Sequence, residues 1–352
     1  MDSWLAELDR LLVAQQAVVL VTVASVKGST PREPGARMLV SEQQVFSTIG
    51  GGHLEYKAIQ IARNMLADDS TQLLQRFSLG AGLGQCCGGV VNLMFECVRE
   101  RQPWVDELIE QQAQGRACVQ VIPLSSQSAQ PRIIVAEDMH DDSPISRFAL
   151  QLLQSQGGCQ IKSFAQAGDV EQSWLFDPVV VDDFRVYVFG AGHVGRALVE
   201  QLSLQEIAVT WVDTRDNQFP QTLMQHVEVC CTDTPESVID AAAAGSYFVI
   251  MTHDHQLDQQ LCEQILRRGD FDYLGLIGSH SKRSKFDQRL MRRGIDPLIL
   301  KRMTCPIGIA GINSKKPAAI ALAVCAQIVQ LQQAAVAEKS EPVQNSRRSI
   351  KL

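Results

Sequence analysis

The sequence predicts an α/β protein of two domains, of which the second is a doubly wound parallel sheet. The first observation is length, because 352 residues exceed the usual size of one domain. The second is an alternation of apolar runs with helical patterns, which begins near residue 184. The third is a glycine-rich turn directly after the first of these runs. We expect a first domain with a connecting segment over 1–180, a second domain over 184–335, and a loose polar tail over 336–352.

Composition and charge exclude several classes of protein. Apolar residues make up 45% and charged residues 20% of the chain, an ordinary globular balance. A net charge of −7 and an aromatic content of 6% disfavour a nucleic-acid partner. We identify neither a secretory signal nor an uncharged apolar stretch of ~18–20 residues, so no membrane association is expected. The ten cysteines lack zinc-site spacing, and for a chain of this length without a recognised signal we expect reduced thiols in the cytoplasm.

The first domain shows alternating helix and strand patterns. Leucines at helical spacing indicate an N-terminal helix, and a β-branched apolar run indicates a buried strand after it. The alternation of Val91, Leu93, Phe95 and Cys97 is typical of a half-buried strand. In order, we expect a helix over 4–16, a strand over 18–26, a hairpin over 38–49, a helix over 53–67 and a strand over 90–98.

Two loops of this domain have the composition of anion sites. The loop after the first strand combines small residues, hydroxyls and two arginines, and arginine presents a planar fork of donors. A triple-glycine turn precedes the next helix, and exposed backbone N–H groups there would suit an anion. The candidate binding residues in these loops are Gly28, Ser29, Thr30, Arg32, Arg37, Gly50, Gly51, Gly52, His53 and Glu55.

The most unusual element is the segment Gln85-Cys86-Cys87-Gly88-Gly89. Structural cysteines usually lie in apolar elements, whereas glycines around these two let backbone and thiol both approach a ligand. A thiolate there could attack sulfur, bind a soft metal or carry a persulfide. By contrast, Cys230 and Cys231 end an apolar strand and are expected to be buried.

The second domain opens with the pattern G-x-G-x-x-G at Gly190, Gly192 and Gly195. An apolar strand precedes it, a helix follows it, and Asp213 ends the next strand, which together predict a dinucleotide-binding (Rossmann) fold. The free N–H groups of the helix N-terminus suit an anion, and Asp213 would accept hydrogen bonds from a ribose diol. His193 would lie at the mouth of the crevice. The ligand stays open between NAD(P) or another nucleotide and a different occupant.

Two further segments of this domain carry polar groups at positions where ligands bind. His253 follows a strand end that faces the crevice, and it would share a face with His255 if the strand continued. With Asp254 these residues could ligate a metal, but a polar loop that supports the ligand is the simpler interpretation. The basic stretch over 279–293 indicates a site for a ligand phosphate or an acidic partner, or else a solvated helix face.

Several motifs occur in one order along the chain, namely GSTPREPGARM (28–38), IGGGHLE (49–55), LGQCCGG (83–89), VYVFGAGHVGRAL (186–198), VDTR (212–215), MTHDHQLD (251–258), LGLIGSHSKR (274–283) and PIGIAGINSKKPAAIA (306–321). Taken together, they resemble the XdhC/CoxI family of accessory proteins for xanthine dehydrogenase and related molybdenum hydroxylases. His53 together with Cys86 and Cys87 resembles the xanthine dehydrogenase branch more than the carbon monoxide dehydrogenase branch.

The resemblance implies an N-terminal XdhC/CoxI-type α/β domain and a C-terminal Rossmann domain. It further implies a chaperone rather than an enzyme, which binds the molybdenum cofactor (molybdopterin), supports its sulfuration and inserts it into apo-xanthine dehydrogenase. Gln85, Cys86 and Cys87 would then handle cofactor and sulfur, with a contact to molybdenum as one possibility and no resident metal site. The cleft between the domains would hold the cofactor.

The implied partners are the molybdenum subunit of the apo-enzyme, a cysteine desulfurase and the proteins that synthesise the cofactor. An apolar C-terminal helix that opens at Pro317 makes a homodimer plausible. The alternative function is an NAD(P)-dependent oxidoreductase, which the glycine pattern and Asp213 favour. Against it, we find no convincing acid pair or Tyr-Lys arrangement for hydride chemistry.

Overall fold

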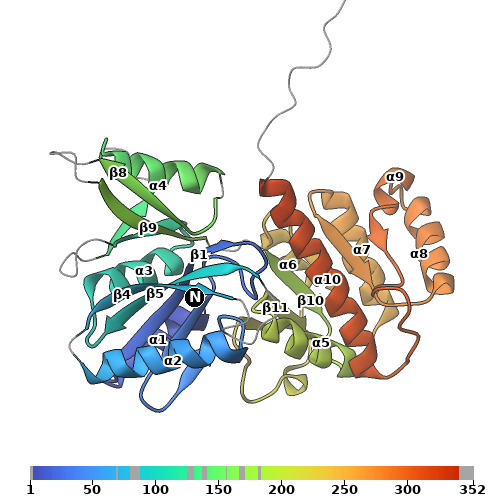
Figure 1. Ribbon diagram of the computed structural model, residues 1–352. Helices are drawn as coiled ribbons and strands as arrows, with labels where there is room; N and C mark the ends of the chain where they lie inside the picture. The colour runs from blue at the N-terminus through green and yellow to red at the C-terminus, as the bar shows by residue number, and fades with distance from the viewer. Residues whose placement is uncertain are drawn as a thin grey trace, which may run out of the picture. The chain divides into compact units, whose positions relative to one another are not determined.

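The protein divides into two compact units (Figure 1). The first consists of Met1–Val181 together with Ser340–Leu352, and the second is Asp182–Lys339. The computed structural model describes residues 3–68, 70–79, 88–124, 131–136, 141–155, 157–165, 171–180 and 184–340.

Two antiparallel sheets form the framework of the first unit. The five-stranded sheet has the order β3-β2-β1-β5-β4, and the four-stranded sheet has the order β7-β6-β9-β8. The expected hairpin is confirmed, because β2 and β3 pair antiparallel. The strands are β1 (Val18–Lys27), β2 (Arg37–Val40), β3 (Val45–Ser47), β4 (Gln72–Ser78), β5 (Val90–Val98), β6 (Cys118–Pro123), β7 (Arg132–Val135), β8 (Gln160–Ala165) and β9 (Glu171–Val179).

Helices and the second sheet cover both faces of the five-stranded sheet. Leu54, Ala58 and Met65 of α2 pack on one face, as the helical pattern predicts. Leucines of α1 and α3 share a core with both sheets on the other face. Consequently β5 is not half-buried as expected, since Met94 and Glu96 are buried as well. The helices are α1 (Ser3–Val13), α2 (Gly52–Ala67), α3 (Pro103–Ala113) and α4 (Pro144–Ser155).

A buried polar cluster lies between the two sheets of this unit. Arg37 Nη2 donates to Asp177 Oδ2 at 2.5 Å, and the Arg37 guanidinium lies 4.4 Å from the centre of the Trp4 ring. Glu96 is only 7% exposed, and its Oε2 has no hydrogen-bond partner among the described residues. Burial raises the pKa of Glu96 to about 8; the Asp177 carboxylate acts in the same direction and Arg37 opposes it.

This raised pKa predicts a pH-dependent stability. The unfolded chain releases the Glu96 proton near pH 4.5, whereas the folded chain holds it to about pH 8. The contribution of Glu96 to the free energy of unfolding is therefore fully present below about pH 4.5 and is lost as pH rises through about 8. A Glu96→Gln variant is expected to lose this dependence and to exceed the parent by about 1–4 kcal/mol in free energy of unfolding near pH 9. Urea unfolding at several pH values would measure it, and Glu42→Gln, on an exposed loop, is the control.

The second unit is a six-stranded sheet with the order β12-β11-β10-β13-β14-β15. Every neighbouring pair is parallel, and the central strand comes first in sequence, which is the dinucleotide-fold order. The expected fold is thereby confirmed. The strands are β10 (Arg185–Phe189), β11 (Ala208–Asp213), β12 (Val227–Cys231), β13 (Tyr247–Ile250), β14 (Tyr273–Leu276) and β15 (Met303–Thr304).

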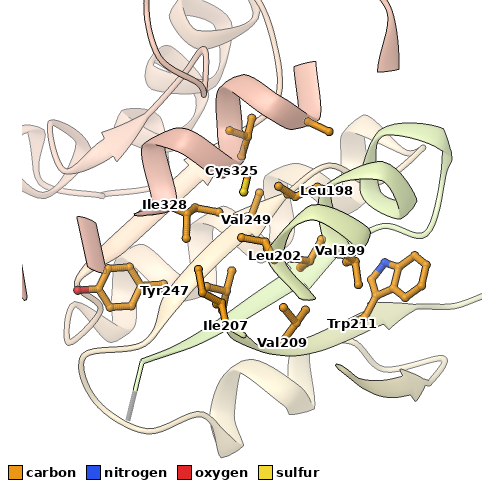
Figure 2. Packing of buried hydrophobic residues seen from close by; sticks show 14 of the residues in the cluster. Leu198, Val199, Leu202, Ile207, Val209, Trp211, Tyr247, Val249, Cys325 and Ile328 are labelled. Carbon is orange, nitrogen blue, oxygen red and sulfur yellow. The ribbon is translucent and has the colours of Figure 1, made fainter. Parts of the chain in front are cut away.

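Helices cover both faces of this sheet. Figure 2 shows one face, where Leu198 and Leu202 of α5 and Ile328 of α10 pack with Val249 of the sheet. Helices α6, α7, α8 and α9 contribute to the core on the other face. The helices are α5 (His193–Leu204), α6 (Glu236–Ala241), α7 (His255–Arg268), α8 (His280–Arg292), α9 (Pro297–Leu300) and α10 (Pro317–Ser340), with a 3₁₀ turn over Asp216–Gln218.

The expected burial of the two cysteines at the end of β12 is wrong. Cys230 is only half-buried and Cys231 is exposed, because β12 is the edge strand of the sheet. The segment Pro317–Ala335 is long and apolar enough to cross a membrane by length and composition, although core helices pass the same test. Ala321 and Val324 of this helix are fully buried in the core of the unit.

Candidate functional site

Two glycines of the predicted fingerprint are required by close packing at the carboxyl end of β10. Gly190 has a φ of +122°, and a Cβ there would lie 2.4 Å from the Met251 carbonyl oxygen. A Cβ on Gly195 would lie 2.0 Å from the Gly190 carbonyl oxygen, so the absence of a side chain lets α5 approach the strand. Both residues are buried, and their lack of a side chain is what permits this packing.

Gly192 differs, because a Cβ there would meet no atom within 4 Å. It is the N-cap residue of α5, and no side chain caps this helix end. A pocket of about 560 Å³ opens at this point. No acidic side chain is among the described residues that line it. The lining consists of the N-terminal backbone of α5 together with other residues, and it includes the basic or titratable side chains of His193, Arg196, Arg215 and His253. The pocket is thus suited to an anion.

Asp213 lies where the sequence predicts, at the end of β11, but its oxygens are engaged within the protein. Oδ2 accepts from the Ala191 N–H at 2.6 Å and from Arg215 Nη2 at 3.0 Å. Oδ1 accepts from the Arg215 N–H and Nε at 3.0 and 2.9 Å. Burial acts to raise the pKa of Asp213, but these hydrogen bonds outweigh it and the pKa is lowered. The carboxylate holds the glycine loop in place.

The space beside Asp213 is small. A hollow of about 10 Å³ lies between Asp213, Pro235 and Leu257, enough for about one water molecule. A ribose bound to this carboxylate would have to displace Arg215 and enlarge the hollow. The larger pocket at the N-terminus of α5 is therefore the part of the crevice that can accept a ligand as it stands.

A buried ion pair, which the sequence analysis missed, supports the other side of the crevice. Asp258 is fully buried and accepts from Lys282 Nζ at 2.7 Å. It also accepts from the N–H and hydroxyl of Thr252, at 3.1 and 2.7 Å, and Thr252 lines the pocket. Lys282 donates in addition to the Ile277 carbonyl at 2.9 Å. The pair thus joins the loops that follow β13 and β14. The sequence feature that could have predicted it is a charged residue after each of these two neighbouring parallel strands.

The histidines after β13 do not form the arrangement considered above. The strand ends at Ile250, and Asp254 caps α7 by accepting from the Gln256 N–H at 2.7 Å. His253 lines the crevice pocket, whereas His255 begins α7 and does not line it. Within the described residues, no group of three or more His, Cys, Asp or Glu side chains is placed to hold a metal ion.

The structure brings the predicted loops of the first unit together. A Cβ on Gly28 would lie 3.3 Å from Gly89 Cα, and one on Gly50 would lie 2.5 Å from Pro31 Cβ. Arg32 Nη1 donates to the Thr48 carbonyl at 3.2 Å. The loop over 28–37, the triple-glycine turn and Gly89 are therefore neighbours at the end of β1.

Many donors of these loops are engaged internally. Glu55 Oε2 accepts from the N–H groups of Ile49 and Gly51, each at 3.1 Å, and from the Thr48 hydroxyl. The Gly50 N–H donates to Thr48 Oγ1 at 3.0 Å. The triple-glycine turn is thus held by Glu55, and its first N–H groups are not directed at a ligand, contrary to the expectation from sequence.

The remaining candidates of the first unit differ in exposure. The Arg37 side chain is 12% exposed and paired with Asp177, so it is a core cation and not an accessible anion ligand. Ser29, Gly52 and His53 are exposed, Thr30 is half-buried, and the His53 ring stacks on the exposed Tyr56 at 6.0 Å, a neighbour that sequence reasoning did not single out. Gln85, Cys86 and Cys87 lie outside the described residues, so the predictions for them stay predictions.

Comparisons with known proteins agree with this architecture. Residues 186–328 match the sequence model of the XdhC Rossmann domain, and residues 11–78 match that of the XdhC and CoxI family. A Bacillus halodurans crystal structure, described as a xanthine dehydrogenase, has a similar fold, with a TM-score of 0.70 and 21% identity over 95% of this chain and 96% of the other.

A curated relative is the uncharacterized protein YqeB of Escherichia coli K12, which is 24% identical over 149 residues. The match covers 42% of this chain and 27% of that protein, so the chain spans about a quarter of the length of this relative.

Proposed function

Because this chain belongs to the XdhC and CoxI family, whose members support the maturation of xanthine dehydrogenase, we propose that it binds the molybdenum cofactor, supports its sulfuration and inserts it into the apo-enzyme. The observation that carries the proposal is the pocket at the N-terminus of α5. It combines an uncapped helix end, a glycine open to the pocket and a basic lining. The cofactor is the cargo of this function and not a resident group.

The chemistry of the cargo suits this pocket. The cofactor is an anionic pterin that carries a phosphate and a dithiolene-bound metal. A phosphate at the α5 N-terminus would receive hydrogen bonds from backbone N–H groups, and Gly192 lets it approach the backbone closely. Arg196 adds positive charge to this pocket, whereas the charge of Arg215 is balanced by Asp213. The crevice therefore supports a phosphate-bearing ligand.

The alternative function, an NAD(P)-dependent oxidoreductase, is less well supported. NAD requires a carboxylate that is free to bind the ribose diol, and NADP requires an arginine that is free for its 2′-phosphate, whereas Arg215 is paired with Asp213. Both oxygens of Asp213 accept hydrogen bonds within the protein, and the adjacent hollow has room for about one water molecule. Nucleotide titration with a hydride-transfer assay would test the alternative, and turnover would contradict our proposal.

The first unit would contribute Ser29, Thr30, Arg32 and His53, which lie on its accessible loops. The apo-enzyme subunit, a cysteine desulfurase, the cofactor-synthesis proteins and a homodimer are the partners that we propose with this function. A cytoplasmic location and a cleft shared by the two units also stay predictions.

The proposal is tested by purifying the protein from cells that synthesise the cofactor and assaying the released pterin and molybdenum. We expect pterin to co-purify, and none to do so from cells in which cofactor synthesis is blocked. Deletion of the gene is expected to lower xanthine dehydrogenase activity without lowering the amount of the enzyme's polypeptide. Absence of pterin together with unchanged activity after deletion would refute the proposal.

A second prediction concerns the cysteine pair. Replacing both Cys86 and Cys87 by serine is expected to abolish most transfer of active cofactor, because a hydroxyl cannot carry sulfur or bind a soft metal. The thermal midpoint should stay unchanged. Cys231→Ser is the matched control, because Cys231 is exposed and lies in the second unit. Transfer that the double variant performs as well as this control would contradict the assigned role.

A further inference from the structure

A second pocket of the Rossmann unit lies between α7 and α8, apart from the residues that line the crevice. It has a volume of about 570 Å³. Figure 1 shows the two helices side by side in this unit. The pocket is lined by residues from the first half of α7 and the end of α8, namely His255, Gln256, Gln259, Gln260, Arg289, Arg292 and Arg293. We call it the α7/α8 groove.

The two basic residues at the start of α8 are neutralised inside the protein. Lys282 pairs with the buried Asp258, and Arg283 pairs with Asp287 at 2.7 Å. Arg283 also donates to the carbonyls of the segment that follows α8. These two residues have a structural role, so they do not contribute free positive charge to the surface.

The basic residues that line the groove are not balanced in this way. Arg289 Nη1 donates at 3.1 Å to the amide oxygen of Gln259, which is uncharged. Arg293 pairs with Glu263 at 2.6 Å, but Arg267 pairs with the same carboxylate at 2.8 Å. Arg292 is exposed, and none of the described residues forms an ion pair with it. In a chain of net charge −7, this groove carries a local positive excess.

The distribution of this charge indicates the kind of ligand. Gln259 contacts Arg289, and one helical turn further along both helices Glu263 contacts Arg293. The guanidinium groups are therefore spread along the groove. Backbone donors do not converge on one point, because the N-terminus of α7 is capped by the Asp254 carboxylate. A compact phosphate would meet converging hydrogen-bond donors at the N-terminus of α5, but not in this groove. Carboxylates spaced along an extended segment match separate arginine forks.

We propose that the α7/α8 groove binds an acidic segment of a partner protein, whose Asp and Glu side chains pair with Arg289, Arg292 and Arg293. The groove is distinct from the crevice, since the two sets of lining residues do not overlap. It therefore provides a way for the protein to recognise a macromolecule while its crevice is occupied. Such an interaction accelerates association and weakens as salt concentration rises.

The test uses the full chain and a fluorescein-labelled oligoglutamate peptide, with binding followed by fluorescence anisotropy. The decisive variant is Arg292→Glu, and its control is Lys285→Glu. Lys285 lies on the same helix and is also exposed, but it does not line the groove, so both variants change the net charge equally. We expect wild-type binding that weakens with salt, a loss of about tenfold or more in affinity for Arg292→Glu, and less than about twofold for Lys285→Glu.

Several outcomes would overturn the proposal. Absence of peptide binding at low salt would do so, as would equal losses in the two variants, because equal losses indicate a general charge effect. Binding of tripolyphosphate that depends on Arg292, without binding of the peptide, would show a small-anion site instead. Thermal melting of both variants verifies that the fold is retained, and Arg292→Gln, which introduces no new charge, provides a milder second variant.

Discussion

Replacing Lys282 by methionine is expected to lower the free energy of unfolding of the Rossmann unit by about 3–5 kcal/mol. Methionine keeps the apolar part of the side chain but leaves the Asp258 carboxylate, which is fully buried, without its cation. Thr252 still donates two hydrogen bonds to this carboxylate, but a buried charge that loses its counter-ion is strongly destabilising, whereas an exposed ion pair contributes little. Urea or thermal unfolding of the full chain would measure the change.

The matched control is Lys285→Met on the same helix. Lys285 is exposed, so this variant is expected to change stability by less than about 0.5 kcal/mol. The double variant Asp258→Asn/Lys282→Met should lose less than the sum of the two single variants, because neither charge is then left alone. A Lys282→Met variant as stable as its control would show that the pair does not hold the two loops together.

Replacing Gly190 by alanine is expected to cost more than about 3 kcal/mol. The new Cβ would lie 2.4 Å from the Met251 carbonyl oxygen and 2.7 Å from its carbon, and both atoms are backbone. The φ of +122° is in addition a conformation that side-chain-bearing residues rarely adopt. Loss of soluble protein or a strongly lowered unfolding midpoint would be the measured result.

Gly192→Ala separates stability from ligand binding at the same loop. Gly192 has a φ of −73° and open space where its Cβ would be, so the substitution should change stability by less than about 1 kcal/mol. The added methyl group would instead occupy the pocket at the point where a phosphate approaches. We expect a folded variant that co-purifies with much less pterin than the parent. Undiminished pterin would move the cofactor site away from α5.

Local patterns predicted much of the fold and part of the site. Apolar spacing predicted the helices and strands over 4–67 and 90–98, and the parallel sheet follows from the order of the elements after residue 184. The strand β4 and the elements over 101–180, which include the second sheet of the first unit, were not placed from sequence. The glycine fingerprint correctly placed Gly190 and Gly192 in the turn after β10 and Gly195 at the start of α5. These features could be predicted because they depend on residues that are close in sequence.

The state of the charged groups could not be predicted in this way. Arg37 looked like an accessible anion ligand, but its partner Asp177 lies on a strand far along the chain. Glu55 looked like a ligand contact, but it binds the turn that precedes its own helix. Asp213 looked free for a ribose, but Arg215 and the Ala191 N–H occupy its oxygens.

The sequence by itself determined many of the elements, their order in the second unit and the glycine loop, since helical and strand periodicity and steric requirements at glycine are local properties. Only the tertiary structure decided which charges are available to a ligand. Burial and pairing depend on what packs against a side chain, as for Asp258 with Lys282 and for Arg292 without an ion-pair partner among the described residues. The sequence motif is the same whether its Arg or Asp is paired or free to bind a ligand. The distance from that side chain to the nearest opposite charge, which only the folded structure defines, distinguishes the two cases.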